Sequence, residues 1–189
     1  YFVGAGSGAP DLITVRGARL LNQADQIIYA GSLVNPELLD YKKESAVVYD
    51  SAKMTLEEVV EKIQEAESTG KMTVRLHTGD PCVYGAIREQ MDELDRLGLA
   101  YEVCPGVSSF CGAAAALNLE YTLPGVSQSV IITRMAGRTP VPERESIASF
   151  AAHHATMVIF LSTGMLKKLS EELIKGGYEA DTPAAIVYK

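Results

Sequence analysis

Val3-Gly4-Ala5-Gly6-Ser7-Gly8-Ala9-Pro10 leads from a short apolar run directly into a glycine-rich loop. Two later loops follow apolar runs in the same way, namely Thr78-Gly79-Asp80-Pro81 and Pro105-Gly106-Val107-Ser108-Ser109. Open α/β sheets bind ligands beyond the carboxyl ends of their strands, and glycine there lets a ligand approach the main chain closely. The three loops therefore predict one ligand pocket built largely of backbone.

Strand-like and helix-like apolar spacing alternate between these loops. Thr55 followed by Glu58 is a capping box, which marks the start of a helix. The spacing predicts strands at residues 1–3, 27–30, 72–76 and 99–103, and helices at 13–24, 56–69 and 87–97. Strands that alternate with helices form parallel βαβ units. We therefore expect an α/β fold in which helices cover both faces of a mostly parallel sheet.

A second, smaller domain is expected after the linker-like run Leu123-Pro124-Gly125-Val126. We place an amino-terminal α/β domain at residues 1–122 and a carboxy-terminal domain of mixed α/β structure at 123–189. Later apolar runs predict strands at 129–132 and 157–161 and helices at 144–152 and 165–175. Both ends of the chain resemble strands cut short, so we expect a fragment of a longer protein whose second domain is incomplete.

Composition narrows the class of protein. The 189 residues carry 24 acidic and 17 basic side chains, a net charge of −7, which argues against a nucleic-acid partner. No apolar stretch approaches the ~20 residues of a spanning helix and no signal peptide is visible, so a cytoplasmic location without membrane attachment is expected. The three cysteines lack CxxC spacing, which favours free thiols over a metal site or disulfides.

Gly4, Gly6 and Ala9 also fit a relaxed dinucleotide-binding fingerprint, a weak signal on its own. The acidic residue expected after the next strand is missing, because Tyr29-Ala30-Gly31-Ser32 stands there. Pro10-Asp11 also occupies the place where the fingerprint helix should already run. A nicotinamide-dependent dehydrogenase is therefore disfavoured.

Other polar residues allow structural or functional interpretations. Asp80, followed by proline, suits a helix N-cap, although its carboxylate or the neighbouring amides could face a polar or cationic ligand. Ser108 lacks the second glycine of a nucleophile elbow, which disfavours a hydrolase, and with Ser109 it is expected to cap the alanine-rich helix that follows. His153 and His154 are adjacent and, on a helix, diverge by about 100°, so they cannot share a metal.

Arg134 and Arg138 belong to a glycine- and proline-containing loop directly after a predicted strand. Two arginines there could clamp carboxylates with forked hydrogen bonds. The same composition is also typical of an ordinary solvated loop.

In this order, the three loops resemble the motifs of the tetrapyrrole methylase family of S-adenosylmethionine-dependent enzymes, over essentially the whole chain. Residues 3–14, 75–81 and 103–109 carry the resemblance. Within the family, residues 28–34, 77–87 and 133–143 look most like the precorrin-4 C11-methyltransferases. Similar uroporphyrinogen-III methylases carry an aspartate where this chain has Ala30, so these and other precorrin methylases are the alternative.

The resemblance implies two α/β domains with S-adenosyl-L-methionine in the cleft between them, S-adenosyl-L-homocysteine as product, and a homodimer. The resemblance also implies that the cofactor contacts Pro10, Thr78, Gly79, Asp80, Val83, Ser108, Ser109, Leu161, Pro183, Ala184 and Ala185. At position 161, related enzymes often have methionine where this chain has leucine. Contacts with the tetrapyrrole, precorrin-4 or cobalt-precorrin-4, are expected at Gly6, Ser7, Tyr29, Lys53, His77, Arg134 and Arg138.

Methyl transfer from a sulfonium to carbon requires positioning and exclusion of water, so neither a catalytic side chain nor a metal is expected. Less favoured alternatives of the same fold are a protein or RNA methylase and a non-catalytic cofactor-binding module.

Overall fold

The computed structural model describes residues 1–31 and 33–187. It divides into two compact units, Tyr1–Ala113 and Ala114–Lys189. The division falls inside helix α4 (Ser109–Leu117), ahead of the boundary at 122/123 that the linker composition suggested. Among the described residues, no helix is both long and apolar enough to cross a membrane.

The first unit is built on a five-stranded sheet in the order β3-β2-β4-β1-β5, in which every neighbouring pair runs parallel. The strands are β1 (Phe2–Gly4), β2 (Gln26–Tyr29), β3 (Val47–Asp50), β4 (Thr73–His77) and β5 (Val103–Cys104). All five end at the same edge of the sheet. Because β4, β1 and β5 are neighbours, the loops that follow them meet at that edge.

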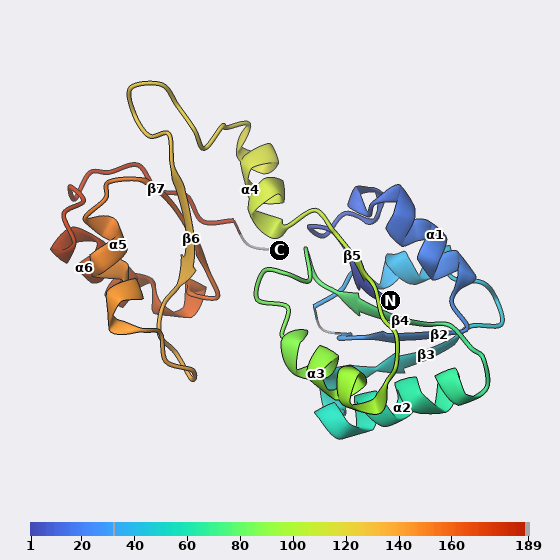
Figure 1. Cartoon of the computed structure of the whole chain (residues 1–189). Coiled ribbons are helices and arrows are strands. Elements are labelled where there is room, and N and C mark those ends of the chain that lie inside the picture. The colour runs from blue at the N-terminus through green and yellow to red at the C-terminus, as the bar shows by residue number, and fades with distance from the viewer. Residues whose placement is uncertain (32, 188–189) are drawn as a thin grey trace. The chain divides into compact units, whose positions relative to one another are not determined.

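Helices cover both faces of this sheet (Figure 1). The chain crosses the sheet in one direction from β1 to β3 and in the opposite direction from β3 to β5, so right-handed crossovers place the helices on opposite faces. Helix α1 (Val15–Gln23) packs with a 3₁₀ helix (Pro36–Tyr41), whereas α2 (Leu56–Ser68) packs with α3 (Arg88–Leu97). The predicted α/β architecture is confirmed.

Local sequence signals set the helix bounds. The Thr14 hydroxyl accepts the Gly17 amide at 3.0 Å where α1 begins. The predicted capping box is present at α2, because the Glu58 amide donates to Thr55 Oγ1 at 3.2 Å and the Thr55 amide donates to Glu58 Oε2 at 2.7 Å. Gly98 ends α3 with a φ of 69°. The strand predicted at 99–103 is shorter in the structure, where β5 spans Val103–Cys104.

The two faces of β4 carry different kinds of side chain, because alternate residues of a strand point to opposite faces. Val74 and Leu76 are fully buried in an apolar core with Val3. Arg75 and His77 lie on the opposite face, toward α3. Strands of parallel sheets are usually apolar on both faces, so this polar pair is an exception.

The second unit pairs two parallel strands, β6 (Val130–Arg134) and β7 (Thr156–Phe160). Helices α5 (Ile147–Ala151) and α6 (Leu166–Lys175) pack on each other. Short 3₁₀ helices span Glu143–Glu145 and Thr163–Met165. The helix predicted over 144–152 is shorter because the chain is extended at Ser146, whose hydroxyl caps α5 by accepting the Ser149 amide. The buried hydroxyl of Ser162 accepts the Met135 amide at 3.1 Å and joins the ends of the strands.

Candidate functional site

The loops after β1 and β4 are joined by backbone hydrogen bonds at the carboxyl edge of the first unit's sheet. The Gly6 amide donates to the Gly79 carbonyl at 3.2 Å, and the Gly79 amide donates to the Gly6 carbonyl at 2.9 Å. Both glycines have positive φ, 84° and 59°, a conformation that glycine adopts without steric cost. The structure thus brings together loops that lie far apart in the sequence.

Glycine in these loops allows the loops to approach one another. A Cβ on Gly106 would lie 2.1 Å from the Gly79 carbonyl oxygen, and a Cβ on Gly4 would lie 2.5 Å from Gly106 Cα. We expected glycine here to make room for a ligand. At Gly4 and Gly106 the backbone of the adjacent loop fills that space.

Asp80 connects two of the three loops. Its Oδ1 accepts the Cys82 amide at 2.8 Å and its Oδ2 accepts the Gly106 amide at 2.9 Å. Partial burial alone would raise the pKa of Asp80, but hydrogen bonds from Cys82 and Gly106 outweigh it and hold the pKa below its ordinary value. The carboxylate is therefore ionised at neutral pH.

The N-cap predicted at Asp80 is wrong, because no helix begins at Pro81. Residues 81–84 form a turn, in which the Val83 amide donates to the Asp80 carbonyl at 3.2 Å, and α3 begins only at Arg88. Pro81 is fully buried. Asp80 caps this turn rather than a helix.

Three hydroxyl residues predicted for the site lie at the same edge. Ser108 is buried, and its carbonyl accepts the amides of Cys111 and Gly112 in the first turn of α4. Thr78 and Ser109 are exposed. The edge thus offers exposed hydroxyl residues, main-chain groups and one carboxylate to a polar ligand.

The first loop does not form a dinucleotide fingerprint. A 3₁₀ helix (Pro10–Leu12) follows the loop, and α1 begins only at Val15, so its amino terminus does not directly follow the glycines. The Gly8 carbonyl accepts Asn35 Nδ2 at 2.9 Å, which fastens the loop to the segment after β2. Ser7 is half-buried, and its Oγ has no hydrogen-bond partner among the described residues.

Tyr29, Lys53 and His77 all follow or end strands at this edge. Tyr29 is half-buried against the apolar core, and Lys53 is exposed in the 3₁₀ helix Ser51–Lys53. His77 is buried, and desolvation together with nearby Arg75 lowers the pKa of His77 to about 3, although a hydrogen bond with the Gly85 backbone opposes the shift. Any contact of His77 with a ligand therefore involves a neutral imidazole.

In the second unit, Arg134 organises its own loop. Its Nη1 donates to the carbonyls of Met135 and Thr139 at 3.1 and 3.2 Å, and its Nη2 donates to the Pro140 carbonyl at 3.0 Å. Arg138 is exposed on the same loop. The two arginines thus differ, because Arg134 shapes the loop that carries Arg138.

Leu161 directly follows β7 in a left-handed conformation, with a φ of 55° and 73% of its surface exposed. Such a backbone is strained for a bulky side chain and marks the carboxyl end of β7 as a special position. Pro183, Ala184 and Ala185 are exposed in a segment without helix or strand.

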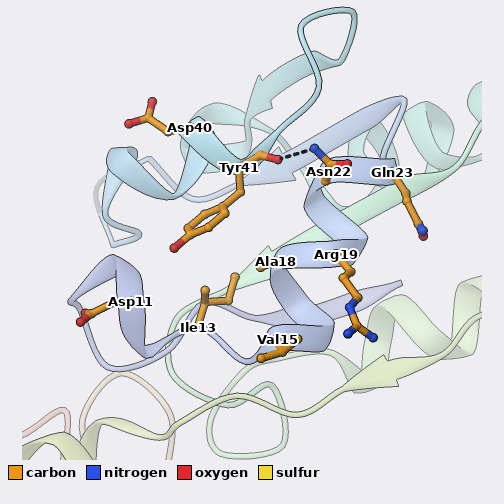
Figure 2. A pocket seen from close by; sticks show the side chains of 9 residues that line it. All are labelled: Asp11, Ile13, Val15, Ala18, Arg19, Asn22, Gln23, Asp40 and Tyr41. Carbon is orange, nitrogen blue, oxygen red and sulfur yellow. Dashed lines mark hydrogen bonds between the residues drawn. The ribbon is translucent and has the colours of Figure 1, made fainter.

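A groove of about 620 Å³ lies on the α1 face of the first unit, between α1 and the 3₁₀ helix Pro36–Tyr41 (Figure 2). Asn22 Nδ2 donates to the Tyr41 carbonyl at 3.4 Å across one end of it. The lining contains none of the residues predicted for the site: Asp11, Ile13, Val15, Ala18, Arg19, Asn22, Gln23, Asp40 and Tyr41. Within the described ranges, no cluster of three or more His, Cys, Asp or Glu could hold a metal ion.

The parallel sheet, with three loops joined at its carboxyl edge, places the first unit in the class of open α/β folds, whose ligands bind beyond the carboxyl ends of the strands. A family model described as Tetrapyrrole (Corrin/Porphyrin) Methylases matches residues 1–189, and the chain belongs to this family. The expected family membership is thereby confirmed.

Individual relatives agree with this assignment. The chain is 55% identical over 186 residues to the cobalt-precorrin-4 C(11)-methyltransferase of Methanocaldococcus jannaschii, covering 98% of this chain and 72% of that protein. It is 46% identical to the precorrin-4 C(11)-methyltransferase of Mycobacterium tuberculosis, covering 99% and 75%.

Solved structures give the same result. A cobalt precorrin-4 methyltransferase of cobalamin biosynthesis superposes with a TM-score of 0.91 at 49% identity, covering 94% of this chain and 74% of that one. The uroporphyrin-III C-methyl transferase of Thermus thermophilus, complexed with S-adenyl homocysteine, has a TM-score of 0.74 at 26% identity and covers 95% and 72%.

Proposed function

We propose that this chain is an S-adenosyl-L-methionine-dependent methyltransferase that methylates C11 of precorrin-4 or cobalt-precorrin-4 in cobalamin biosynthesis. The observation that carries the proposal is the 55% identity to a cobalt-precorrin-4 C(11)-methyltransferase over 98% of the chain. A structural relative that holds S-adenyl homocysteine supports the cofactor.

The loops of the first unit fit this cofactor chemically. S-adenosyl-L-methionine supplies an activated methyl group and brings an adenine, ribose hydroxyls, an amino acid group and a sulfonium. The ionised carboxylate of Asp80 suits a cationic ligand, and the exposed residues Thr78 and Ser109 suit its hydroxyl and amine groups. We propose that these residues bind the cofactor together with Pro10, Gly79, Val83 and Ser108.

We also propose roles in this activity for residues of the second unit. We assign cofactor contacts to Leu161, Pro183, Ala184 and Ala185, and contacts with tetrapyrrole carboxylates to Arg138 and Arg134. Arg138 suits a direct contact because it is exposed, whereas Arg134 directs its Nη1 and Nη2 hydrogen bonds to loop carbonyls. In the first unit, Gly6, Ser7, Tyr29, Lys53 and the neutral His77 are assigned to the macrocycle.

The residues assigned here bind and orient the reactants and exclude water, which suffices when the methyl donor is already activated. Aligning two reactants in this way lowers the barrier without a covalent enzyme intermediate. Backbone loops fixed by hydrogen bonds suit this task, because they hold a ligand in one geometry.

Transfer of label from methyl-labelled S-adenosyl-L-methionine tests the proposal, with precorrin-4, cobalt-precorrin-4 and uroporphyrinogen III as separate acceptors. We expect the full-length protein to label one of the first two, with the mass of one added methyl group and a carbon spectrum that places it at C11. Label in uroporphyrinogen III alone would favour the other branch of the family. Cofactor binding without label in any acceptor would overturn the proposed activity.

We also propose that the protein is a cytoplasmic homodimer. Its three cysteines are free, which agrees with a reducing compartment. Light scattering on the full-length protein tests the assembly, and a mass of one chain would contradict it.

A further inference from the structure

The face of β4 toward α3 carries a half-buried arginine, Arg75, whose hydrogen-bond partners among the described residues are neutral groups. Arg75 Nε donates to Gln90 Oε1 at 3.1 Å, and Nη1 donates to the Ile28 carbonyl at 3.2 Å. Burial lowers the pKa of Arg75 to about 10, so the guanidinium is charged at neutral pH. In the described part of the chain no carboxylate forms an ion pair with it. A partly desolvated charge of this kind depends on the groups that do bind it.

Gln90 extends this interaction to the loop before α3. Its side chain is in the first turn of α3, and the residue is 7% exposed. While Oε1 accepts from Arg75, Nε2 donates to the Ala86 carbonyl at 3.0 Å. One amide thus links the half-buried guanidinium of Arg75 to the backbone of residue 86.

The loop at 81–87 is strained where this link ends. Tyr84 and Ala86 have positive φ, 56° and 48°, and a Cβ on Gly85 would lie 2.1 Å from the Pro81 carbonyl oxygen. Left-handed backbone is strained for non-glycine residues, which keep it only where the surroundings hold them. The Gln90 amide is one of the groups that hold Ala86.

We propose that Arg75 and Gln90 are positioning residues, which hold residues 81–87 in the conformation that presents Asp80 and Val83 to the cofactor. This inference rests on the proposed function. Arg75 fixes the amide of Gln90, so that its NH₂ group is directed at the Ala86 carbonyl. Both residues act through the loop in this proposal and not on the reactants themselves.

The Gln90→Glu variant distinguishes an effect on the conformation of the loop from an effect on the stability of the fold. The glutamate still accepts from Arg75, with a stronger, charge-assisted hydrogen bond, but it has no N–H to donate to the Ala86 carbonyl. The matched control is Gln26→Ala. Gln26 is also 7% exposed and donates to the Lys62 carbonyl at 2.9 Å and to Thr73 Oγ1 at 3.1 Å, but it lies at the opposite end of the sheet.

The test is titration calorimetry of S-adenosyl-L-homocysteine on the full-length protein, together with urea unfolding. We expect Gln90→Glu to raise the Kd about tenfold while its unfolding midpoint stays at or above that of the wild type. Gln26→Ala should lower the midpoint and leave the Kd unchanged. Ala86→Gly added to Gln90→Glu should restore part of the affinity, because glycine adopts the left-handed backbone without cost.

Wild-type affinity in Gln90→Glu, or an equal loss in Gln26→Ala, would overturn the inference and leave the proposed function intact. Failure of the wild-type protein to bind S-adenosyl-L-homocysteine would overturn both.

Discussion

Asp80→Asn removes one of the two hydrogen bonds that the Asp80 carboxylate accepts, of which one lies within its own turn and the other joins the turn to the loop after β5. The two Asp80 oxygens each accept a different amide, from Cys82 at 2.8 Å and from Gly106 at 2.9 Å. An asparagine has one carbonyl oxygen, so in either rotamer one of these N–H groups faces an NH₂ group. Since a hydrogen bond to a charged group contributes about 1.5–3 kcal/mol, we expect the free energy of unfolding to fall by about 2–3 kcal/mol.

Asp50→Asn is the matched control. Asp50 also accepts two amides, from Gly31 and Ala52, each at 2.9 Å, but both bind the same Oδ1. An asparagine carbonyl keeps both, so we expect this variant to lose much less stability than Asp80→Asn. Urea unfolding followed by circular dichroism measures both changes. Wild-type stability in Asp80→Asn, or an equal loss in Asp50→Asn, would refute the reasoning.

The effect of Asp80→Asn should depend on pH. Burial alone would raise the pKa of Asp80, but hydrogen bonds hold it below the ordinary value of 3.8 that applies when the chain is unfolded. On acidification the unfolded chain therefore takes up the proton first. The stabilisation is complete above the unfolded pKa and is lost as the pH falls through the folded pKa. The stability difference between wild type and Asp80→Asn should narrow below about pH 4.

Three further variants test other parts of the structure. Gly106→Ala should lower the free energy of unfolding by about 1–3 kcal/mol, because its Cβ would collide with the backbone of Gly79 and Gly4. Gly164→Ala is the control: a Cβ there has no atom within 4 Å, so the same urea assay should show no change. Arg138→Ala should raise the KM for the tetrapyrrole about tenfold without changing the unfolding midpoint. Arg134→Ala should raise the KM and also lower the midpoint. Unchanged KM values would remove both arginines from the proposed site. Thr55→Ala should cost about 1 kcal/mol through the lost cap of α2, and calorimetric melting measures it.

Features encoded by neighbouring residues could be predicted from the sequence. Apolar runs ahead of glycine loops indicated the parallel sheet and the loops at its edge, because strand ends and turns depend on a few adjacent residues. The Thr55–Glu58 capping box was visible for the same reason, and the structure confirms it.

Features that depend on distant partners could not be predicted. Asp80 resembled an N-cap because a local motif carries no information on Gly106, whose amide lies 26 residues away in sequence. Arg134 resembled a free cation, whereas the turn of its own loop brings three carbonyls to its guanidinium. Gln90 belongs to no motif of the sequence, and only the fold brings its side chain to the half-buried Arg75. These polar contacts arise from tertiary packing, which hydrophobic periodicity does not encode.

The reciprocal hydrogen bonds between Gly6 and Gly79 give these loops the character of an additional pair in the sheet. Their conformational entropy is therefore lost when the unit folds and not when a ligand arrives. A ligand that binds at this edge of the sheet would meet groups that are already ordered. Little of its binding free energy would then be lost in ordering the loops. The amide protons of both glycines should exchange with solvent as slowly as those of β1 and β4, although both residues lie beyond the strand ends.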